Sequence, residues 1–205
     1  MTKPIIGILG GGQLGMMLCD SAKEIDIETH VFCPDDDCPS KGRSTYFSVG
    51  EYSDEEKIIK FSNSVDFITY EFENIPIKTV DFIKDQNKIR PGKQSLLLTQ
   101  DRLTEKRFLD KLNIPIAPYK DLKTIDDVIS AQNEFINSIV KTRTLGYDGK
   151  GQFNLRQSDD PNKVFNRIVN KSIIEKRIPF EFEVSVIIGR DINNNTTIFP
   201  IGKNI

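Results

Sequence analysis

Uninterrupted apolar runs alternate with stretches of helical periodicity through the first half of the chain. The runs predict strands, and the stretches between them repeat apolar residues every three or four positions, which predicts helices. The predicted strands are 4–9, 28–32, 45–49 and 65–70, and the predicted helices are 13–24, one beginning at Ser53, and 77–85. Strands that alternate with helices form a parallel sheet covered on both faces, so we expect an α/β domain.

The second half of the chain has a different pattern, in which strand-like runs lie close enough together for hairpins. Its predicted helices are 95–112, 124–135 and 160–169, and its predicted strands are 138–143, 153–156, 173–178, 183–188 and 197–201. NIPIAPY (113–119) carries two prolines and is predicted to be a linker or an edge segment. We therefore predict an α+β second domain, with domains of residues 1–95 and 96–205.

Short polar signals predict where three helices begin. Ser53 with Glu56, and Thr124 with Asp127, have the spacing of a capping box. Asp101 is a candidate N-cap inside the stretch 95–112.

The charge balance excludes one class of partner. The formal net charge is -2, the pI is about 5.6, and lysines and arginines are spread along the chain. No basic surface for nucleic acid is therefore expected. No stretch is apolar and long enough to span a membrane, and the N-terminus lacks the features of a signal peptide. We expect a cytoplasmic protein without a nucleic-acid or membrane partner.

The cysteines and the single histidine point to no metal site. Cys19, Cys33 and Cys38 form no CxxC pair, and His30 lies in a predicted strand. Zinc would need more ligands than these, so we predict reduced thiols and no zinc site. A nucleophile activated by histidine would have to use His30, and we do not expect one.

The first glycine cluster, Gly10–Gly15, follows the first predicted strand and opens the first helix in the pattern G-x-G-x-x-G. Such glycines permit a tight turn and let backbone N–H groups approach an anion, as in a Rossmann-like first crossover. A dinucleotide site also needs an acid at the end of the second strand, where the chain reads Phe32-Cys33-Pro34. NAD or FAD is therefore disfavoured, and Gly15 can equally serve only close packing of the helix on the sheet.

The second cluster, TRTLGYDGKGQF (142–153), places Gly146, Gly149 and Gly151 between two predicted strands. It is not a Walker A loop, because Lys150 is followed by glycine instead of serine or threonine. A glycine loop between strands can lie over nucleotide phosphates, with Lys141 and Lys150 supplying positive charge. An ordinary glycine-rich hairpin explains this motif alone equally well.

Acids in the following strands suit a nucleotide. Glu175 ends an apolar run, and alternation puts Glu181 and Glu183 on one face with Phe182 on the other. These carboxylates can accept hydrogen bonds from ribose hydroxyls or from an adenine amino group. A solvent-facing acidic strand is the alternative.

Five segments in this order resemble the ATP-grasp superfamily: GGGQLGMML, TYEFENIP, QDRLTEKRFLDKLNIPIAPY, VKTRTLGYDGKGQFNLR and IIEKRIPFEFEVSVI. Within that superfamily the whole chain is similar to the 5-(carboxyamino)imidazole ribonucleotide synthases of purine biosynthesis. The resemblance implies a Rossmann-like pre-ATP-grasp domain followed by an α+β ATP-grasp domain. It also implies that ATP phosphorylates bicarbonate, and that the carboxyphosphate, or CO2 released from it, carboxylates the amine of 5-aminoimidazole ribonucleotide. This chemistry needs electrostatic stabilisation of phosphoryl transfer and no covalent nucleophile.

The resemblance further implies how ATP is bound. Lys141 lies near the phosphates, residues 146–152 form a phosphate flap, residues 175–178 line the adenine cleft, and Glu183 binds the ribose. The implied ATP-binding residues are Arg102, Lys141, Gly146, Tyr147, Asp148, Gly149, Lys150, Gly151, Gln152, Glu175, Lys176, Arg177, Ile178, Glu183 and Lys203, and the implied catalytic residues are Tyr147, Asp148 and Lys150. Some relatives have arginine where Lys150 stands, and lysine keeps the charge without the bidentate geometry.

For the ribonucleotide, the resemblance implies a site at the first glycine loop, with Gly11, Gly12, Gln13 and Leu14. Glu71 and Glu73 follow the strand 65–70, at the end where open α/β sheets place ligands. One of the two is expected to accept a hydrogen bond from the substrate's amine, and a solvated acidic loop is the alternative.

The family holds Mg2+ with carboxylates late in the ATP-grasp domain. The sequence ends in a strand-like run before such residues, so we expect an incomplete ATP-grasp domain, Mg2+ ligands outside these 205 residues, and no turnover by the chain alone. The resemblance also implies a homodimer.

Two other hypotheses stay open. A different ATP-grasp ligase, acting on glycinamide ribonucleotide or biotin, would share the flap and differ in the first domain. A non-catalytic Rossmann-type nucleotide-binding module would need an acid that the second strand lacks.

Overall fold

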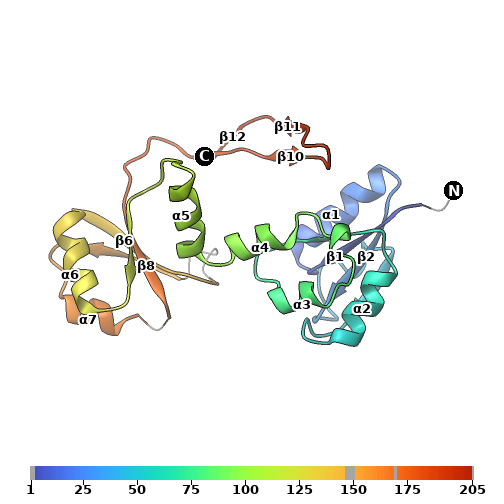
Figure 1. Cartoon of the computed structure of the whole chain (residues 1–205), viewed down its shortest axis with the longest axis horizontal. Helices are drawn as coiled ribbons and strands as arrows, with labels where there is room; N and C mark the ends of the chain where they lie inside the picture. Colours follow the sequence, from blue (N-terminus) through green and yellow to red (C-terminus); the bar gives the residue numbers. More distant parts are fainter. Residues whose placement is uncertain (1–2, 146–150, 169, 205) are drawn as a thin grey trace.

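The computed structural model describes residues 3–145, 151–168 and 170–204. Its first part is built on a parallel sheet with the strand order β3-β2-β1-β4 (Figure 1). The strands are β1 (Ile5–Leu9), β2 (Glu28–Cys33), β3 (Tyr46–Val49) and β4 (Phe67–Tyr70). The helices are α1 (Gln13–Glu24), α2 (Glu55–Asn63), α3 (Ile77–Asp81) and α4 (Lys93–Thr99), with a 3-10 turn at Gln86–Lys88.

Helices cover both faces of this sheet because its strands are apolar on both sides. Ile8 and Val31 pack with Cys19 of α1 on one face. Leu9 and Phe32 pack on the other face with residues from α2, α3 and α4. The predicted α/β domain with a parallel sheet is therefore confirmed.

The second part is built on an antiparallel sheet with the strand order β5-β8-β6-β7. The strands are β5 (Tyr119–Leu122), β6 (Asn137–Thr142), β7 (Gln152–Arg156) and β8 (Ser172–Lys176), and the helices are α5 (Arg102–Lys111), α6 (Ile125–Glu134) and α7 (Pro161–Asn166). Figure 1 shows α6 and α7 on one side of the sheet and α5 on the other. A core between the sheet and α6 and α7 contains Val128, Val140, Leu155 and Ile174, as an α+β domain requires.

Residues 177–204 leave this sheet as an arm. The arm carries the short strands β9 (Val184–Ser185), β10 (Ile188–Arg190), β11 (Thr196–Ile198) and β12 (Gly202–Lys203). β9 pairs with β12 and β10 pairs with β11, and every residue of the arm is exposed. In Figure 1 the arm crosses above the two compact parts instead of packing into either.

Two predicted helices differ from the structure, one in its first residue and the other in its continuity. The capping box at Ser53 is wrong: Asp54 is the N-cap, and its side chain accepts a hydrogen bond from the Lys57 amide at 3.1 Å. The stretch 95–112 is not one helix, because Asp101 takes an extended conformation and caps α5. Its Oδ1 accepts the amides of Leu103 and Thr104 at 2.9 and 3.0 Å. The candidate cap at Asp101 and the capping box at Thr124 are confirmed.

Two further predicted elements have other boundaries in the structure. The helix predicted over 77–85 stops at Asp81, and Nε2 of the Gln86 side chain donates to the carbonyls of Val80 and Ile83 around its end. The strand predicted at 183–188 is divided between β9 and β10. No helix in the described part of the chain is long and apolar enough to cross a membrane.

Candidate functional site

Three charged side chains meet on the α5 face of the second sheet. Lys141 of β6 and Glu175 of β8 project to this face, with Nζ and Oε2 2.8 Å apart. Nζ of Lys106, from α5, lies 3.4 Å from Oε1 of the same carboxylate. The side chains of Lys106 and Glu175 are only 12% and 11% exposed. Two ammonium groups thus share one buried carboxylate, which leaves the cluster with excess positive charge suited to a phosphate.

Neighbouring groups hold Lys106 in place. Its ammonium lies 5.2 Å from the centre of the Tyr119 ring and also donates to the Ala117 carbonyl at 3.4 Å. Burial raises the pKa of the adjacent Glu105, and the charge of Glu175 adds to that shift, while Arg102 and Lys106 oppose it. The sequence did not single out Lys106. The available signal was its position four residues after Arg102, which places both on one face of α5.

Arg143 joins the start of α5 to the end of β6. Its Nε and Nη2 atoms donate to Oδ2 of Asp101 at 2.9 and 2.6 Å. The Arg102 amide donates to the Arg143 carbonyl at 2.9 Å, so Arg102 is fixed at the same junction. Burial alone would raise the pKa of Asp101, but hydrogen bonds from Arg143 and from two backbone amides outweigh burial and lower it.

Most of the predicted phosphate flap lies outside the described residues, namely Gly146, Tyr147, Asp148, Gly149 and Lys150. The strands on either side of it are described, and they are antiparallel neighbours, so the strand–loop–strand frame is present. Gly151 accepts the Thr142 amide at 2.8 Å, and Gln152 is the register partner of Lys141.

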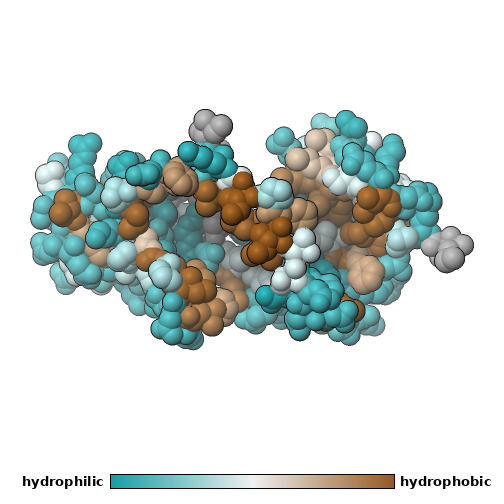
Figure 2. Space-filling view, turned by 90° about the horizontal axis from the view of Figure 1, so that it is seen from above, coloured by the Kyte–Doolittle hydropathy of each residue, from teal (hydrophilic) through white to brown (hydrophobic). Residues whose placement is uncertain are grey.

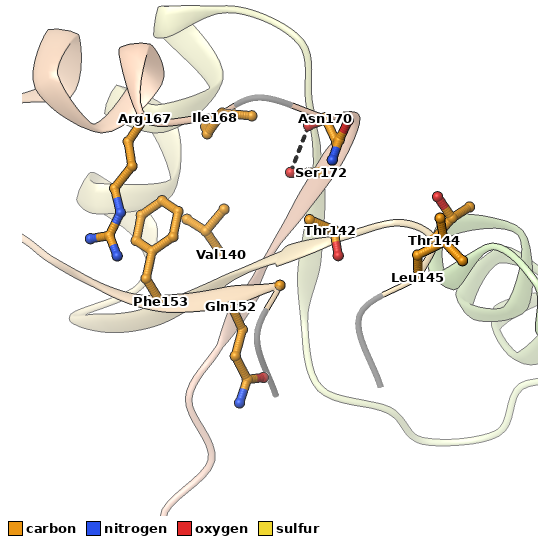
Figure 3. A pocket seen from close by; sticks show the side chains of 11 residues that line it. Val140, Thr142, Thr144, Leu145, Gln152, Phe153, Arg167, Ile168, Asn170 and Ser172 are labelled. Carbon is orange, nitrogen blue, oxygen red and sulfur yellow. Dashed lines mark hydrogen bonds between the residues drawn. The ribbon is translucent and has the colours of Figure 1, made fainter. Parts of the chain in front are cut away.

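A hollow of about 400 Å³ lies beside this frame, on the opposite face of the sheet (Figure 3). Val140 and Phe153, which are register partners, line it together with Arg167. The Arg167 guanidinium lies 4.2 Å from the centre of the Phe153 ring. Gln152 points away from Phe153 in Figure 3. Because Gln152 is the register partner of Lys141, the two side chains take the same face of the sheet. The hollow is therefore separate from the Lys106–Lys141–Glu175 cluster.

The segment predicted to line an adenine cleft begins at the end of β8, an inner strand of the same sheet, and continues into the residues that follow it. The amides of Lys176 and Arg177 donate to the carbonyls of Pro118 and Asn137 at 2.8 and 2.9 Å. Arg177 and Ile178 then line a second hollow of about 390 Å³.

Glu183 and Lys203 lie on the exposed arm and not on the sheet that carries Lys141 and Glu175. The Glu183 carbonyl accepts the Asn204 amide at 2.9 Å, and Nζ of Lys203 lies 4.6 Å from the centre of the Phe182 ring. The pairing of β9 with β12 brings Glu183 and Lys203 into the same ribbon of the arm. Neither residue lies in the charged cluster.

In the first part, the Glu71 carboxylate occupies the glycine loop at the start of α1. The amides of Gly12 and Gly15 donate to its two oxygens at 2.6 and 2.5 Å. Glu71 follows β4 at the carboxyl end of the sheet, as expected for a ligand-binding position. A carboxylate from the chain itself therefore sits where a helix N-terminus attracts anions.

Close contacts between this loop and neighbouring atoms explain why two of its positions are glycine. A Cβ atom on Gly11 would collide with Sγ of Cys38 and lie 2.8 Å from Sγ of Cys33. A Cβ atom on Gly15 would lie 2.8 Å from the Gly10 carbonyl oxygen and 2.9 Å from Glu71 Oε2. Both positions therefore require glycine for packing, whatever the loop binds.

The remaining predicted residues of the loop differ in exposure. Leu14 is 58% exposed and Gln13 is also exposed, so both face outward from the start of α1. Glu73 is half-buried, and its Oε1 accepts the Asn74 side-chain amide at 2.7 Å. Of the two candidate acids, Glu71 is the one that contacts the glycine loop.

The histidine and the cysteines have structural surroundings. His30 bonds to the hydroxyls of Ser64 and Ser48 at 2.9 and 2.8 Å, and burial lowers its pKa. The three cysteines are free and buried, and burial raises the pKa of Cys33 to about 11. In residues 3–145, 151–168 and 170–204, no three His, Cys, Asp or Glu side chains gather as a metal site would need.

Comparison with known proteins matches both parts of the chain to families. Residues 1–100 match the ribonucleotide synthetase preATP-grasp domain, and residues 107–205 match the ATP-grasp domain. A bifunctional purine synthesis protein of Dictyostelium discoideum is 36% identical over 205 residues, which is 97% of this chain and 21% of that protein.

Two shorter relatives carry the name of one enzyme. N5-carboxyaminoimidazole ribonucleotide synthase of Bacillus subtilis is 36% identical over 203 residues, covering 98% of this chain and 53% of the relative. The crystal structure of N5-carboxyaminoimidazole synthetase from Staphylococcus aureus complexed with ADP has a TM-score of 0.91 and 36% identity, covering 100% of this chain and 56% of that one. The chain therefore spans about half the length of these relatives.

Proposed function

Because the chain belongs to the ATP-grasp superfamily, we propose that it contributes to ATP-dependent carboxylation of 5-aminoimidazole ribonucleotide. In this reaction ATP and bicarbonate give ADP, phosphate and 5-(carboxyamino)imidazole ribonucleotide, a step of purine biosynthesis. The observation that carries the proposal is the charged cluster of Lys106, Lys141 and Glu175 in a domain that matches the ATP-grasp family.

The cluster suits the phosphates of ATP. Its two partly buried ammonium groups and single carboxylate give a positive site with little solvent screening. Lys141 is the cation expected to reach the phosphates, with Arg102 fixed nearby by its bond to Arg143. Glu175 then faces the adenine amino group, with Lys176, Arg177 and Ile178 along the cleft, and Gln152 projects to the same face as Lys141.

The remaining roles follow from the family resemblance. Gly146, Gly149 and Gly151 allow the flap to lie against the phosphates, and Tyr147, Asp148 and Lys150 face carboxyphosphate. Glu183 binds the ribose hydroxyls, and Lys203 is a further ATP-binding residue. Preorganised positive charge and backbone amides stabilise the transferring phosphoryl group without a covalent enzyme intermediate.

We place the ribonucleotide at the glycine loop of the first part. The residues are Gly11, Gly12, Gln13, Leu14, Glu71 and Glu73. Each oxygen of Glu71 uses one lone pair for a backbone amide and keeps another, so it can accept a hydrogen bond from the substrate's amine while it orders the loop. Glu71 is therefore favoured over Glu73 for this contact.

The other components complete the proposal. Mg2+ would neutralise charge on the phosphates, but the described residues offer no cluster of carboxylates to hold it, so no ligand is assigned in this chain. We also propose a cytoplasmic homodimer.

Nucleotide binding by the purified chain tests the proposal. Millimolar ADP or ATP is expected to raise the melting temperature, whereas NAD is not, because a ligand stabilises only a state that binds it. Lys141→Met should weaken ADP binding about tenfold or more, equivalent to about 1.4 kcal/mol.

Lys163→Met is the matched control, because Lys163 lies in α7 on the opposite side of the same sheet and is exposed. It should leave ADP binding unchanged. Stabilisation by NAD and not by ADP would replace this proposal with a Rossmann-type binding module.

A further inference from the structure

The hollow of about 400 Å³ beside the strand–loop–strand frame has an apolar wall with a polar side chain at each end. Alternation along β6 places Val140 and Thr142 on the face opposite Lys141. Val140 forms the wall with Phe153 and with Ile168, which follows α7. Thr142 lies two residues beyond Val140, which places it about 7 Å farther along the strand.

The hydroxyl of Thr142 is the polar group at one end of this wall. It is buried and makes no hydrogen bond within the described part of the chain. Ser172, its register partner in β8, also lines the hollow, but the Ser172 hydroxyl donates to the Asn170 carbonyl at 2.9 Å. Buried polar groups without a partner destabilise a fold and are rare unless a ligand or a water molecule satisfies them. The Thr142 hydroxyl therefore marks a hydrogen-bonding position for a ligand.

Arg167 supplies positive charge at the other end of the wall. Figure 3 shows Arg167, Phe153, Val140 and Thr142 in this order across the hollow. Among the lining residues that the structure describes, Arg167 is the only charged one, so no acid competes for it there. Its guanidinium is stacked on Phe153, 4.2 Å from the ring centre. Stacking covers the flat face of the guanidinium and leaves the N–H groups at its edge to bind a carboxylate.

The surroundings make this apolar wall a local feature. Figure 2 shows mostly hydrophilic residues over the end of the molecule where α6 and α7 lie in Figure 1, and a larger gathering of hydrophobic residues over the middle. The volume of the hollow is in the range of pockets that hold small molecules. A small ligand with an apolar body therefore fits this hollow better than a protein surface does.

We propose that the hollow binds a small aromatic carboxylate with a second hydrogen-bonding group at the far end of its ring. The carboxylate pairs with Arg167, the ring lies against Val140 and Phe153, and the far group bonds to Oγ1 of Thr142. One cation balances a carboxylate monoanion better than a phosphate dianion. The site lies on the face of the sheet opposite Lys141 and Glu175, so it is separate from the proposed ATP site and does not rest on it.

A titration with 4-hydroxybenzoate tests the proposal, because this probe has a carboxylate and a hydroxyl at opposite ends of a benzene ring. The 205-residue chain is titrated without nucleotide, and binding is followed by NMR through the backbone amide shifts. Saturable binding is expected, with the largest shifts at Phe153, Arg167 and Ser172. Benzoate, which lacks the hydroxyl, should bind about threefold or more weakly, because it cannot bond to Thr142.

Arg167→Met tests the charged end of the site. It should weaken the binding of both probes about tenfold or more, because it removes the partner of the carboxylate. Arg156→Met is the matched control, since Arg156 lies in β7 three residues from Phe153 and projects to the opposite face of the sheet. It should leave both affinities unchanged. Both arginines are exposed, so both variants should keep the melting temperature of the parent chain.

Thr142→Val tests the other end of the site. Valine has nearly the shape of threonine without its hydroxyl, so 4-hydroxybenzoate should lose its advantage and bind only as well as benzoate. Because the hydroxyl has no partner in the described chain, the variant should melt at or above the temperature of the parent.

Absence of saturable 4-hydroxybenzoate binding would overturn the proposal, as would binding that Arg167→Met leaves unchanged. Equal affinities of the two probes for the parent chain would overturn the contact with Thr142. Because no nucleotide is present, these outcomes are independent of ADP binding, which tests the proposed function separately.

Discussion

At the residue scale, the buried carboxylate of Glu175 has two cationic partners, Lys106 and Lys141, instead of one. If Lys141 turns toward a phosphate, Lys106 still neutralises the carboxylate. Without Lys106, the same movement would leave a buried charge without a partner, which is costly. Lys106 is therefore a positioning residue in the proposed reaction.

Lys106→Met should accordingly weaken ADP binding about tenfold or more, as measured by calorimetry, because Lys141 would be held by Glu175. Lys106→Arg keeps the charge and should recover most of the affinity. A purely structural role would instead lower the melting temperature of both variants and leave their ADP affinity equal.

At the element scale, one side chain both begins α5 and attaches it to the sheet. Asp101 caps the helix through two backbone amides and accepts hydrogen bonds from Nε and Nη2 of Arg143 at the end of β6. The apolar periodicity of 95–112 continues through this position, so periodicity alone predicts one helix. The break reflects a competing hydrogen-bonding preference, since aspartate favours an N-cap over a helix interior.

Asp101→Asn should separate the two roles, because asparagine caps a helix well but cannot form the ion pair. We expect a loss of about 1–3 kcal/mol in the free energy of unfolding at pH 7, measured with urea. Asp101→Ala should cost about 1 kcal/mol more through the lost cap.

The pH dependence of the free energy of unfolding gives a second test of the ion pair between Asp101 and Arg143. The pKa of Asp101 is lower in the folded chain, so its contribution is present above the unfolded pKa and is lost as the pH falls through the folded value. Asp101→Asn should therefore flatten the acid side of the stability profile. If the acid side of the stability profile did not change, the ion pair would contribute nothing to the free energy of unfolding.

At the scale of the whole molecule, α4 connects the two parts and belongs to the first core. Leu96 is fully buried with Ile75 and Ile89. The domain boundary that we place after residue 95 falls inside α4, and a first domain ending at 100 keeps the helix whole.

A fragment of residues 1–100 should therefore unfold cooperatively on heating, whereas a fragment of residues 1–95 should melt lower. The loss of a fully buried leucine side chain costs about 2–5 kcal/mol. Leu96→Ala in the 1–100 fragment is the control and should reproduce much of the difference. Equal melting temperatures for the two fragments would place the first core's limit before α4.

The sequence by itself determined the features that depend on local spacing. Alternating strands and helices indicate the parallel sheet, the glycine loop follows β1, Thr124 and Asp127 mark a helix start, and the arm alternates in polarity. These follow from the periods of helices and strands and from hydrogen bonds between near neighbours. The family resemblance supplied the residue roles, which remain predictions.

Only the tertiary structure decided which distant residues meet. Glu71 reaches Gly12 across 59 positions and Arg143 reaches Asp101 across 42, and Lys106 comes from a different element than Glu175. Such contacts depend on how helices pack on a sheet and which face each side chain takes. No local period carries that information, because it arises when separate elements bury their apolar faces together.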